Sequence, residues 1–134
     1  MRLLNVHSLQ LESFIGNRVP DYAILSHTWG DEEVTFEELG TPEAAAKQGF
    51  DKITRTCARA AADGYSYVWI DTCCIDKRSS AELSEAINSM FRWYQEAQIC
   101  YAHLEDSVGL SGIPRRCRWF RRGWWRRLYA RSLA

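Results

Sequence analysis

The sequence predicts an α/β fold in which helices flank an open, mainly parallel β-sheet. Three short runs of apolar, β-prone residues, at 22–26, 67–70 and 99–104, show no polar alternation, which is typical of strands covered on both faces. Two segments with a helical repeat of apolar residues separate these runs. Strands and helices that alternate with short connections favour right-handed βαβ crossovers and a parallel sheet.

The composition is that of one globular domain. The chain has 134 residues, of which 46% are hydrophobic and 13% aromatic, and this excludes the polar, highly charged class of disordered proteins. No apolar run approaches the roughly 20 residues of a membrane span, and residues 1–16 lack the apolar stretch and cleavage site of a secretion signal. We therefore expect a soluble, cytoplasmic protein with no membrane partner.

Cysteine and histidine usage predicts neither disulfides nor a metal site. The five cysteines are an odd number, and Cys73 and Cys74 are neighbours, which favours a reduced compartment. The spacings typical of zinc sites, C-x-x-C and H-x-x-x-H, do not occur in the sequence, and His7, His27 and His103 lie far apart in it. No bound metal is expected.

The first part of the chain predicts one strand, a shorter extended segment and a helix start. Residues 22–26 form a short apolar run that ends in a small polar cluster, so they should be a buried strand. Residues 33–36 alternate polar and apolar side chains, which suits an edge strand. The triplet Thr-Pro-Glu at residues 41–43 is typical of a helix start, and a first helical piece should run to residue 48.

Two longer helices and two further strands complete the prediction. Residues 50–63 repeat apolar side chains at steps of three and four before Gly64, and they predict one amphipathic helix. Residues 67–70 should be the central parallel strand. A capping box at residues 79–82, Ser-Ser-Ala-Glu, begins a second helix of about 18 residues. Residues 99–104 follow this helix directly as the third strand.

The loops that follow the predicted strands hold the candidate ligand-binding residues. In open α/β sheets, ligands bind outside the carboxyl ends of the strands. The candidates are Ser26, Thr28, Trp29 and Gly30 after the first strand, Asp71, Cys74 and Asp76 after the central strand, and the acidic pair at residues 105–106 after the last. Hydroxyl, carboxylate and indole groups that meet at one sheet edge predict a polar ligand site. The pattern assigns no catalytic residue.

Each of these residues also has an ordinary structural interpretation. Small hydroxyl side chains and Asp71 often satisfy backbone groups at strand ends, and a Trp beside a Gly more often packs than stacks on a ligand. A lone His27 is usually structural. Cys73 or Cys74 would need a base and a lowered pKa to act as a nucleophile. The expected co-location of the loops is what favours a site.

Two segments resemble the motifs of fungal heterokaryon incompatibility (HET) domains. They are residues 22–36, YAILSHTWGDEEVTF, and residues 67–77, YVWIDTCCIDK, and a third match covers residues 79–101. The resemblance implies a module of fungal non-self recognition that triggers cell death and works through protein partners or self-association. HET domains are distantly similar to TIR domains, which implies a TIR-like or flavodoxin-like three-layer arrangement and NAD or a related nucleotide as the candidate ligand.

The resemblance ends near Trp124, which divides the chain into a HET-like domain at residues 1–124 and a divergent tail at residues 125–134. HET domains usually read RGWTLQEL where this chain reads RGWWRRLY at residues 122–129. An ungapped match puts Leu128 at the glutamate position, and the TIR comparison implies that this glutamate is catalytic. We therefore expect a truncated or frame-shifted copy that does not hydrolyse NAD.

The residues leave three other functions possible. Residues 107–134 hold eight Arg, five aromatic side chains and no acid, a composition that could bind nucleic acid. Residues 1–106 carry all 17 acidic residues and would repel the same ligand, so nucleic acid is not expected as a partner. A hydrolase with Cys73 or Cys74 as nucleophile and His27 as base lacks an orienting third group in the sequence. A TIR-like NAD hydrolase is the third alternative, if another carboxylate replaces the glutamate.

Overall fold

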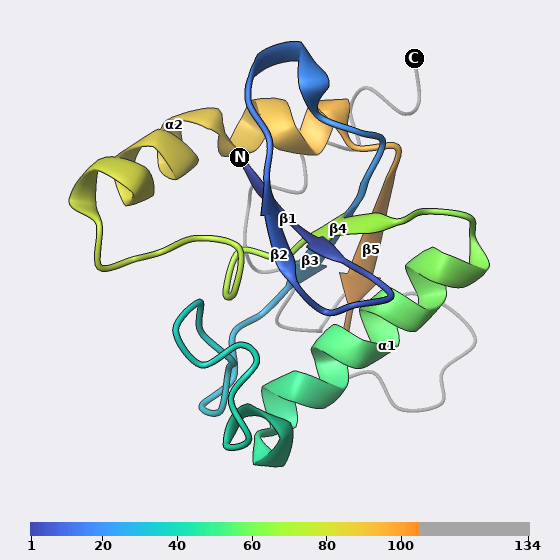
Figure 1. The fold of residues 1–134 in the computed structure, drawn as a ribbon, viewed down its shortest axis with the longest axis vertical. Helices are drawn as coiled ribbons and strands as arrows, with labels where there is room; N and C mark the ends of the chain where they lie inside the picture. Colours follow the sequence, from blue (N-terminus) through green and yellow to red (C-terminus); the bar gives the residue numbers. More distant parts are fainter. Residues whose placement is uncertain (105–134) are drawn as a thin grey trace.

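The structure, a computed structural model, describes residues 1–104, which form one five-stranded sheet and two α-helices (Figure 1). The strands are β1 (Arg2–Asn5), β2 (Leu11–Ser13), β3 (Ala23–His27), β4 (Tyr67–Trp69) and β5 (Ile99–His103), in the order β2-β1-β4-β3-β5 across the sheet. The helices are α1 (Gln48–Ala62), between β3 and β4, and α2 (Ser80–Glu96), between β4 and β5; short 3₁₀ turns lie at Gly16–Arg18 and Ala44–Ala46. The α/β class is confirmed.

The three predicted strands lie side by side and parallel, as expected. β3 pairs with β4 through Ala23 and Val68, and with β5 through Ala23 and Ile99. The expectation that the whole sheet is mainly parallel is wrong, because β1 is antiparallel to both β2 and β4, and the sheet is mixed. The sequence did not reveal this N-terminal hairpin because its strands gain their place by pairing with each other and with β4, and such pairing leaves no local pattern.

Both α-helices begin and end close to the predicted residues. Ser79 is the N-cap of α2, where its hydroxyl accepts a hydrogen bond from the backbone N–H of Glu82 at 3.3 Å. The Glu82 side chain does not return this bond, as a full capping box requires, but accepts one from the backbone N–H of Asp76 at 3.0 Å. Within residues 1–104, neither helix is long and apolar enough to cross a membrane.

Residues 33–36 are not a strand, which corrects the prediction for this segment. Thr35 donates its backbone N–H and its hydroxyl to the carboxylate of Glu38, at 3.0 and 3.1 Å. These local bonds hold the chain in turns and use a donor that a sheet would need. The helix start at Thr41 is also shorter than expected: its hydroxyl accepts from the first residue of the 3₁₀ turn Ala44–Ala46, and no longer helical piece forms before α1.

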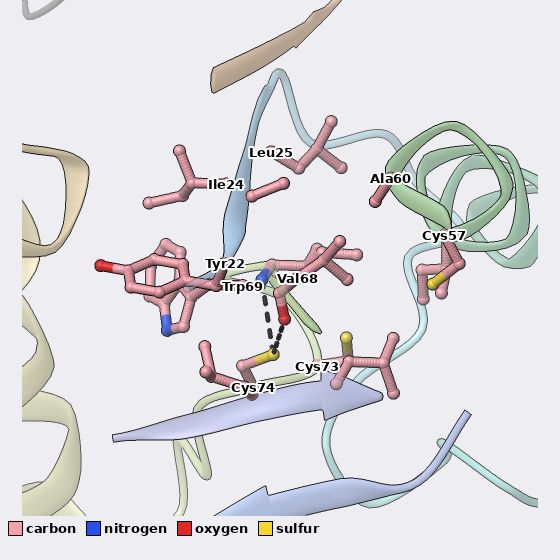
Figure 2. Packing of buried hydrophobic residues seen from close by; sticks show 14 of the residues in the cluster. Tyr22, Ile24, Leu25, Cys57, Ala60, Val68, Trp69, Cys73 and Cys74 are labelled. Atoms are coloured by element: carbon pink, nitrogen blue, oxygen red, sulfur yellow. Dashed lines mark hydrogen bonds between the residues drawn. The ribbon is translucent and has the colours of Figure 1, made fainter. Parts of the chain in front are cut away.

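The two α-helices lie on opposite faces of the sheet at β4. Val68 lies on the side of Cys57 and Ala60 of α1 (Figure 2). Trp69, the next residue, faces α2, where its ring meets Trp93 edge-on with the ring centres 5.5 Å apart. Trp69 is 1% exposed, which confirms that this strand is covered on both faces. Because successive side chains of β4 point to opposite faces of the sheet, this strand packs against both helices.

Candidate functional site

The carboxyl ends of β3 and β4 form the topological switch point of the sheet. β3 leads to α1 on one face, and β4 leads to α2 on the other, so the two connecting loops turn away from each other. Open α/β sheets bind their ligands at such points. His27, the last residue of β3, meets Asp71, two residues beyond β4, at this edge.

Asp71 holds both His27 and Trp29 in place. Nε2 of His27 lies 2.8 Å from one carboxylate oxygen of Asp71, and the indole N–H of Trp29 donates to the other oxygen at 3.0 Å. The His27 side chain is buried, whereas Trp29 is 41% exposed. An indole fixed through its N–H thus presents a flat apolar surface to solvent beside a buried polar pair.

Lys52 and Glu33 continue the network on the side of α1. The Lys52 ammonium lies 3.2 Å from Nδ1 of His27 and 2.5 Å from a carboxylate oxygen of Glu33. A charged ammonium only donates, so Nδ1 accepts, and the ring carries its hydrogen on Nε2, which donates to Asp71. We call Glu33, Lys52, His27, Asp71 and Trp29 the strand-end cluster.

Opposing effects set the pKa of the Asp71 carboxyl. Its burial raises the pKa, but the hydrogen bond and the charge of His27, the hydrogen bond from Trp29 and the charge of Lys77 outweigh burial and hold the pKa below its ordinary value. The Lys77 ammonium donates to the backbone carbonyl of Asp71 at 2.7 Å and lies 4.7 Å from the centre of the Trp29 ring. Lys77 therefore brings a positive charge to the exposed indole.

The structure brings most of the predicted ligand-binding residues to this edge. Besides Trp29 and Asp71, Thr28 gives its backbone carbonyl to the Lys52 ammonium at 3.3 Å. The backbone N–H of Gly30 donates to the Glu33 carboxylate at 2.7 Å. Ser26 is fully buried within β3, and its side chain alternates with that of His27 to the other face of the sheet.

Cys74 and Asp76 do not join the strand-end cluster, which corrects their assignment to the same site. Cys74 is buried in the core, where its sulfur accepts a hydrogen bond from the backbone N–H of Ile70 at 3.4 Å (Figure 2). Asp76 is held by the Arg78 guanidinium through both carboxylate oxygens. The third predicted loop, at residues 105–106, lies outside the described residues.

Within residues 1–104, the geometry does not support a nucleophile at Cys73 or Cys74. The hydrogen bond with Cys74 and burial raise the pKa of the Cys73 thiol well above its ordinary value, so the reactive thiolate is disfavoured. Both ring nitrogens of His27 are engaged, with Asp71 and Lys52 and with no thiol. Across the part of the chain that the structure describes, no three His, Cys, Asp or Glu side chains are placed to hold a metal ion. The strand-end cluster is therefore defined by its hydrogen bonds and its ion pair.

Lys52, Glu33 and Lys77 were missing from the predicted site. The sequence did contain a signal for Lys52, which falls on the buried stripe of α1 directly before Ile53. A charged side chain in that place requires a partner of opposite charge. No comparable signal pointed to Glu33, because its pairing arises only when its loop packs on α1.

Gly49 allows that loop to approach α1. The backbone N–H of Gly49 donates to the carbonyl of Glu32 at 2.9 Å. A Cβ atom at Gly49 would lie 2.6 Å from this carbonyl oxygen and 2.8 Å from Cα of Glu33, closer than side chains tolerate. The missing side chain at Gly49 therefore places the Glu33 carboxylate within reach of Lys52.

Comparisons with known proteins identify relatives over most of the chain. A family model described as "Heterokaryon incompatibility protein (HET)" matches residues 22–123. The chain is 47% identical over 119 residues to the vegetative incompatibility protein HET-E-1 of Podospora anserina, in a match that covers 80% of this chain and 9% of that protein. The chain thus spans less than a tenth of the length of this curated relative. No solved structure matches it.

Proposed function

Since the chain belongs to the heterokaryon incompatibility (HET) family, we propose that it serves as a cell-death signalling module in fungal non-self recognition. The family match at residues 22–123 includes every residue of the strand-end cluster. The relative that shares 47% identity is named for vegetative incompatibility. In this proposal the module acts in the cytoplasm, through protein partners or self-association.

The ligand that we propose for the strand-end cluster is a nucleotide of the NAD type. One observation carries this assignment: the exposed Trp29 ring is fixed on Asp71, with the Lys77 ammonium 4.7 Å from the ring centre. An indole offers a stacking surface for a base, and an ammonium attracts phosphate groups. The TIR-like, three-layer arrangement that the resemblance implies belongs to the same proposal, because such sheets bind ligands at the switch point.

We expect this chain to bind NAD without hydrolysing it. An ungapped match places Leu128 where the family has its glutamate, and residues 107–134 contain no acidic side chain. Cleavage of the nicotinamide bond passes through a cationic sugar that a placed carboxylate stabilises. Asp71 is a poor substitute, because both of its oxygens already accept hydrogen bonds from His27 and Trp29.

An NMR titration of the ¹⁵N-labelled chain with NAD and ADP-ribose tests the binding site. The shifts should centre on Trp29, Gly30 and Asp71, and Trp29→Ala should weaken binding by about tenfold, the usual effect of losing a stacked base. Arg55→Gln is the matched control, because Arg55 is an exposed residue of α1. Shifts confined to the surface around Arg55 would contradict the proposed site.

Turnover and signalling need separate measurements. Incubation of the purified chain with excess NAD should release no nicotinamide, and release that Asp71→Asn abolishes while NAD still binds would show that Asp71 does replace the glutamate. Inducible expression of the chain in a fungal host should reduce the viability of the host cells. Expression of the Arg55→Gln variant should reduce it equally. Unchanged viability together with normal NAD binding would contradict the signalling role and leave the ligand site intact.

A further inference from the structure

A groove lies on the α2 side of the sheet, away from the strand-end cluster. A cavity of about 380 Å³ has Trp69 of β4 in its wall, with Phe14 and Ile15 on the hairpin side and Glu85 and Trp93 on the α2 side. A second cavity, of about 520 Å³, shares the last four of these residues. The shared walls make the two cavities one groove, and each volume is in the range of small-molecule sites.

The indole N–H groups of two largely buried Trp side chains in this wall have no hydrogen-bond partner among residues 1–104. Trp69 and Trp93 are 1% and 7% exposed, yet neither nitrogen donates to any of those residues. Among residues 1–104, one polar side-chain atom, Oγ1 of Thr72, is fully enclosed and has no hydrogen-bond partner, and neither indole nitrogen is in that class. The two indole nitrogens are therefore not sealed, and the groove is the open space that both rings line. Buried Trp N–H groups normally donate to an acceptor.

Most charged groups of the wall have a charged partner or are exposed, but the N-terminal ammonium of Met1, which lines both cavities, donates only to the backbone carbonyl of Phe14 at 3.1 Å. The Arg2 guanidinium is paired with the Glu82 carboxylate, and Arg92 lies 3.8 Å from Glu96. Glu85 is exposed and keeps its hydration. The groove therefore offers aromatic surface, two indole N–H donors and the partly buried Met1 ammonium, and these groups favour a ligand with a hydrogen-bond acceptor.

We propose that this groove binds a small aromatic or heteroaromatic molecule that carries a hydrogen-bond acceptor. Phe14, Trp69 and Trp93 would contact its ring, and the indole N–H of Trp69 would donate to its acceptor. The site is independent of the proposed nucleotide site, because no member of the strand-end cluster lines either cavity. Its hairpin wall also precedes residue 22, where the family match begins.

A pair of matched probes tests the proposal on the whole chain. Acetophenone carries a carbonyl acceptor, and ethylbenzene has nearly the same shape without one. NMR titration should give acetophenone about three- to tenfold tighter binding, the usual effect of one neutral hydrogen bond. The indole N–H resonance of Trp69 should move further downfield with acetophenone than with ethylbenzene, which shifts it only through its ring current, and this readout needs no variant.

Variants separate the contribution of the hydrogen bond to binding from that of the cavity. Trp69→Phe keeps an aromatic ring and removes the N–H, so the two probes should then bind equally. Ala81 is exposed and lines the first cavity, so Ala81→Leu should weaken both probes, whereas Ser84→Leu, at an exposed position of α2 outside the lining, should weaken neither. Equal affinity of the two probes for the unaltered chain, shifts centred on Trp29, or no saturable binding of either probe would overturn the proposal.

Discussion

Lys52 and Glu33 form an ion pair of 2.5 Å whose side chains are only 8% and 10% exposed. Breaking a buried pair by removing one partner leaves the other charge desolvated and unpaired, which typically costs about 3–5 kcal/mol. We expect Lys52→Met to lower the free energy of unfolding by that amount. Urea denaturation followed by circular dichroism measures the change.

A less buried pair in the same chain supplies the control, although the Lys47 ammonium of this pair also donates to the backbone carbonyl of Glu33 at 3.2 Å. Lys47 and Glu38 also lie 2.5 Å apart, but their side chains are 30% and 34% exposed. Solvated pairs of this kind contribute about 0–1 kcal/mol, so Lys47→Met should change stability little. Adding Glu33→Gln to Lys52→Met should recover part of the loss. Similar small losses for both Lys variants would contradict the assigned role of the buried pair.

The second prediction concerns the contact between Gly49 and the Glu33 loop. Within a helix, replacing Gly by Ala usually stabilises by about 1 kcal/mol. Here the new Cβ would meet backbone atoms of Glu32 and Glu33 at 2.6 and 2.8 Å, and backbone cannot rotate away as a side chain can. Gly49→Ala should therefore destabilise the domain by about 1–3 kcal/mol, as overpacking does. A rise in the thermal midpoint would show that the loop moves freely.

The elements that the sequence predicted correctly are those whose patterns are local. The unbroken apolar run at β4 and the helical repeat of α1 express burial directly, and no partner needs to be known to read them. The β1–β2 hairpin has no such pattern, because its strands gain their place by pairing with each other and with β4. The extended segment at residues 33–36 failed for a related reason: the bonds of Thr35 to Glu38 competed with strand formation.

The site divides in the same way. Residues at strand ends, such as Trp29 and Asp71, follow from topology alone. The two hydrogen-bond partners of His27 do not follow from topology. They lie 25 and 44 residues away from it in sequence, in α1 and after β4. Long-range pairing of this kind leaves no periodic signal. Cys74, in contrast, shares a loop with Asp71 but points into the core, which loop position cannot reveal.

The third prediction tests the core at β4. Trp69 packs edge-on against both Trp93 and Tyr94, with ring centres 5.5 and 6.1 Å away. Trp69→Ala should cost about 3–5 kcal/mol, the usual range for a buried aromatic side chain. Phe91→Ala, at a position that is 50% exposed on α2, should cost far less. An unchanged denaturation midpoint for Trp69→Ala would mean that this face of β4 is not part of the core.

The fourth prediction concerns thiol reactivity. Burial, with a smaller contribution from Cys74, raises the pKa of the Cys57 thiol to about 12, and Cys73 and Cys74 are also buried. Thiolates are the reactive species, so these three side chains should resist Ellman's reagent at pH 8 in the folded protein and react after denaturation. Peptide mapping identifies the labelled positions. Rapid labelling of Cys73 or Cys74 in the native state would restore the case for a cysteine nucleophile.

The last prediction follows from the pKa of Asp71, which His27, Trp29 and Lys77 hold below its ordinary value in spite of burial. A carboxyl whose pKa is lowered on folding stabilises the native state above its unfolded pKa of about 3.9, and that stabilisation is lost as the pH falls through the folded pKa. A ¹³C carboxyl titration should therefore give Asp71 a midpoint below about 3.9. Asp71→Asn should lower the free energy of unfolding by about 1–3 kcal/mol at pH 7, the usual effect of losing hydrogen bonds to a charged group, and the difference from the unaltered chain should narrow below about pH 4.

The direction of this pH effect separates two models of the switch point. If Asp71 accepts hydrogen bonds from both His27 and Trp29, acid removes its advantage over asparagine, because a protonated carboxyl can no longer accept as a charged group from both donors. If Asp71 were instead kept protonated by burial, its midpoint would lie above about 3.9, and the stability difference would widen as the pH falls. Exposed Asp51, which is paired with Arg55 at the surface of α1, provides the matched control. The Asp51→Asn variant should have almost the same free energy of unfolding as the unaltered chain, both at pH 7 and below about pH 4. A raised midpoint for Asp71 would remove the fixed, charged carboxylate on which the orientation of the Trp29 ring depends, and with it the stacking platform proposed for the nucleotide.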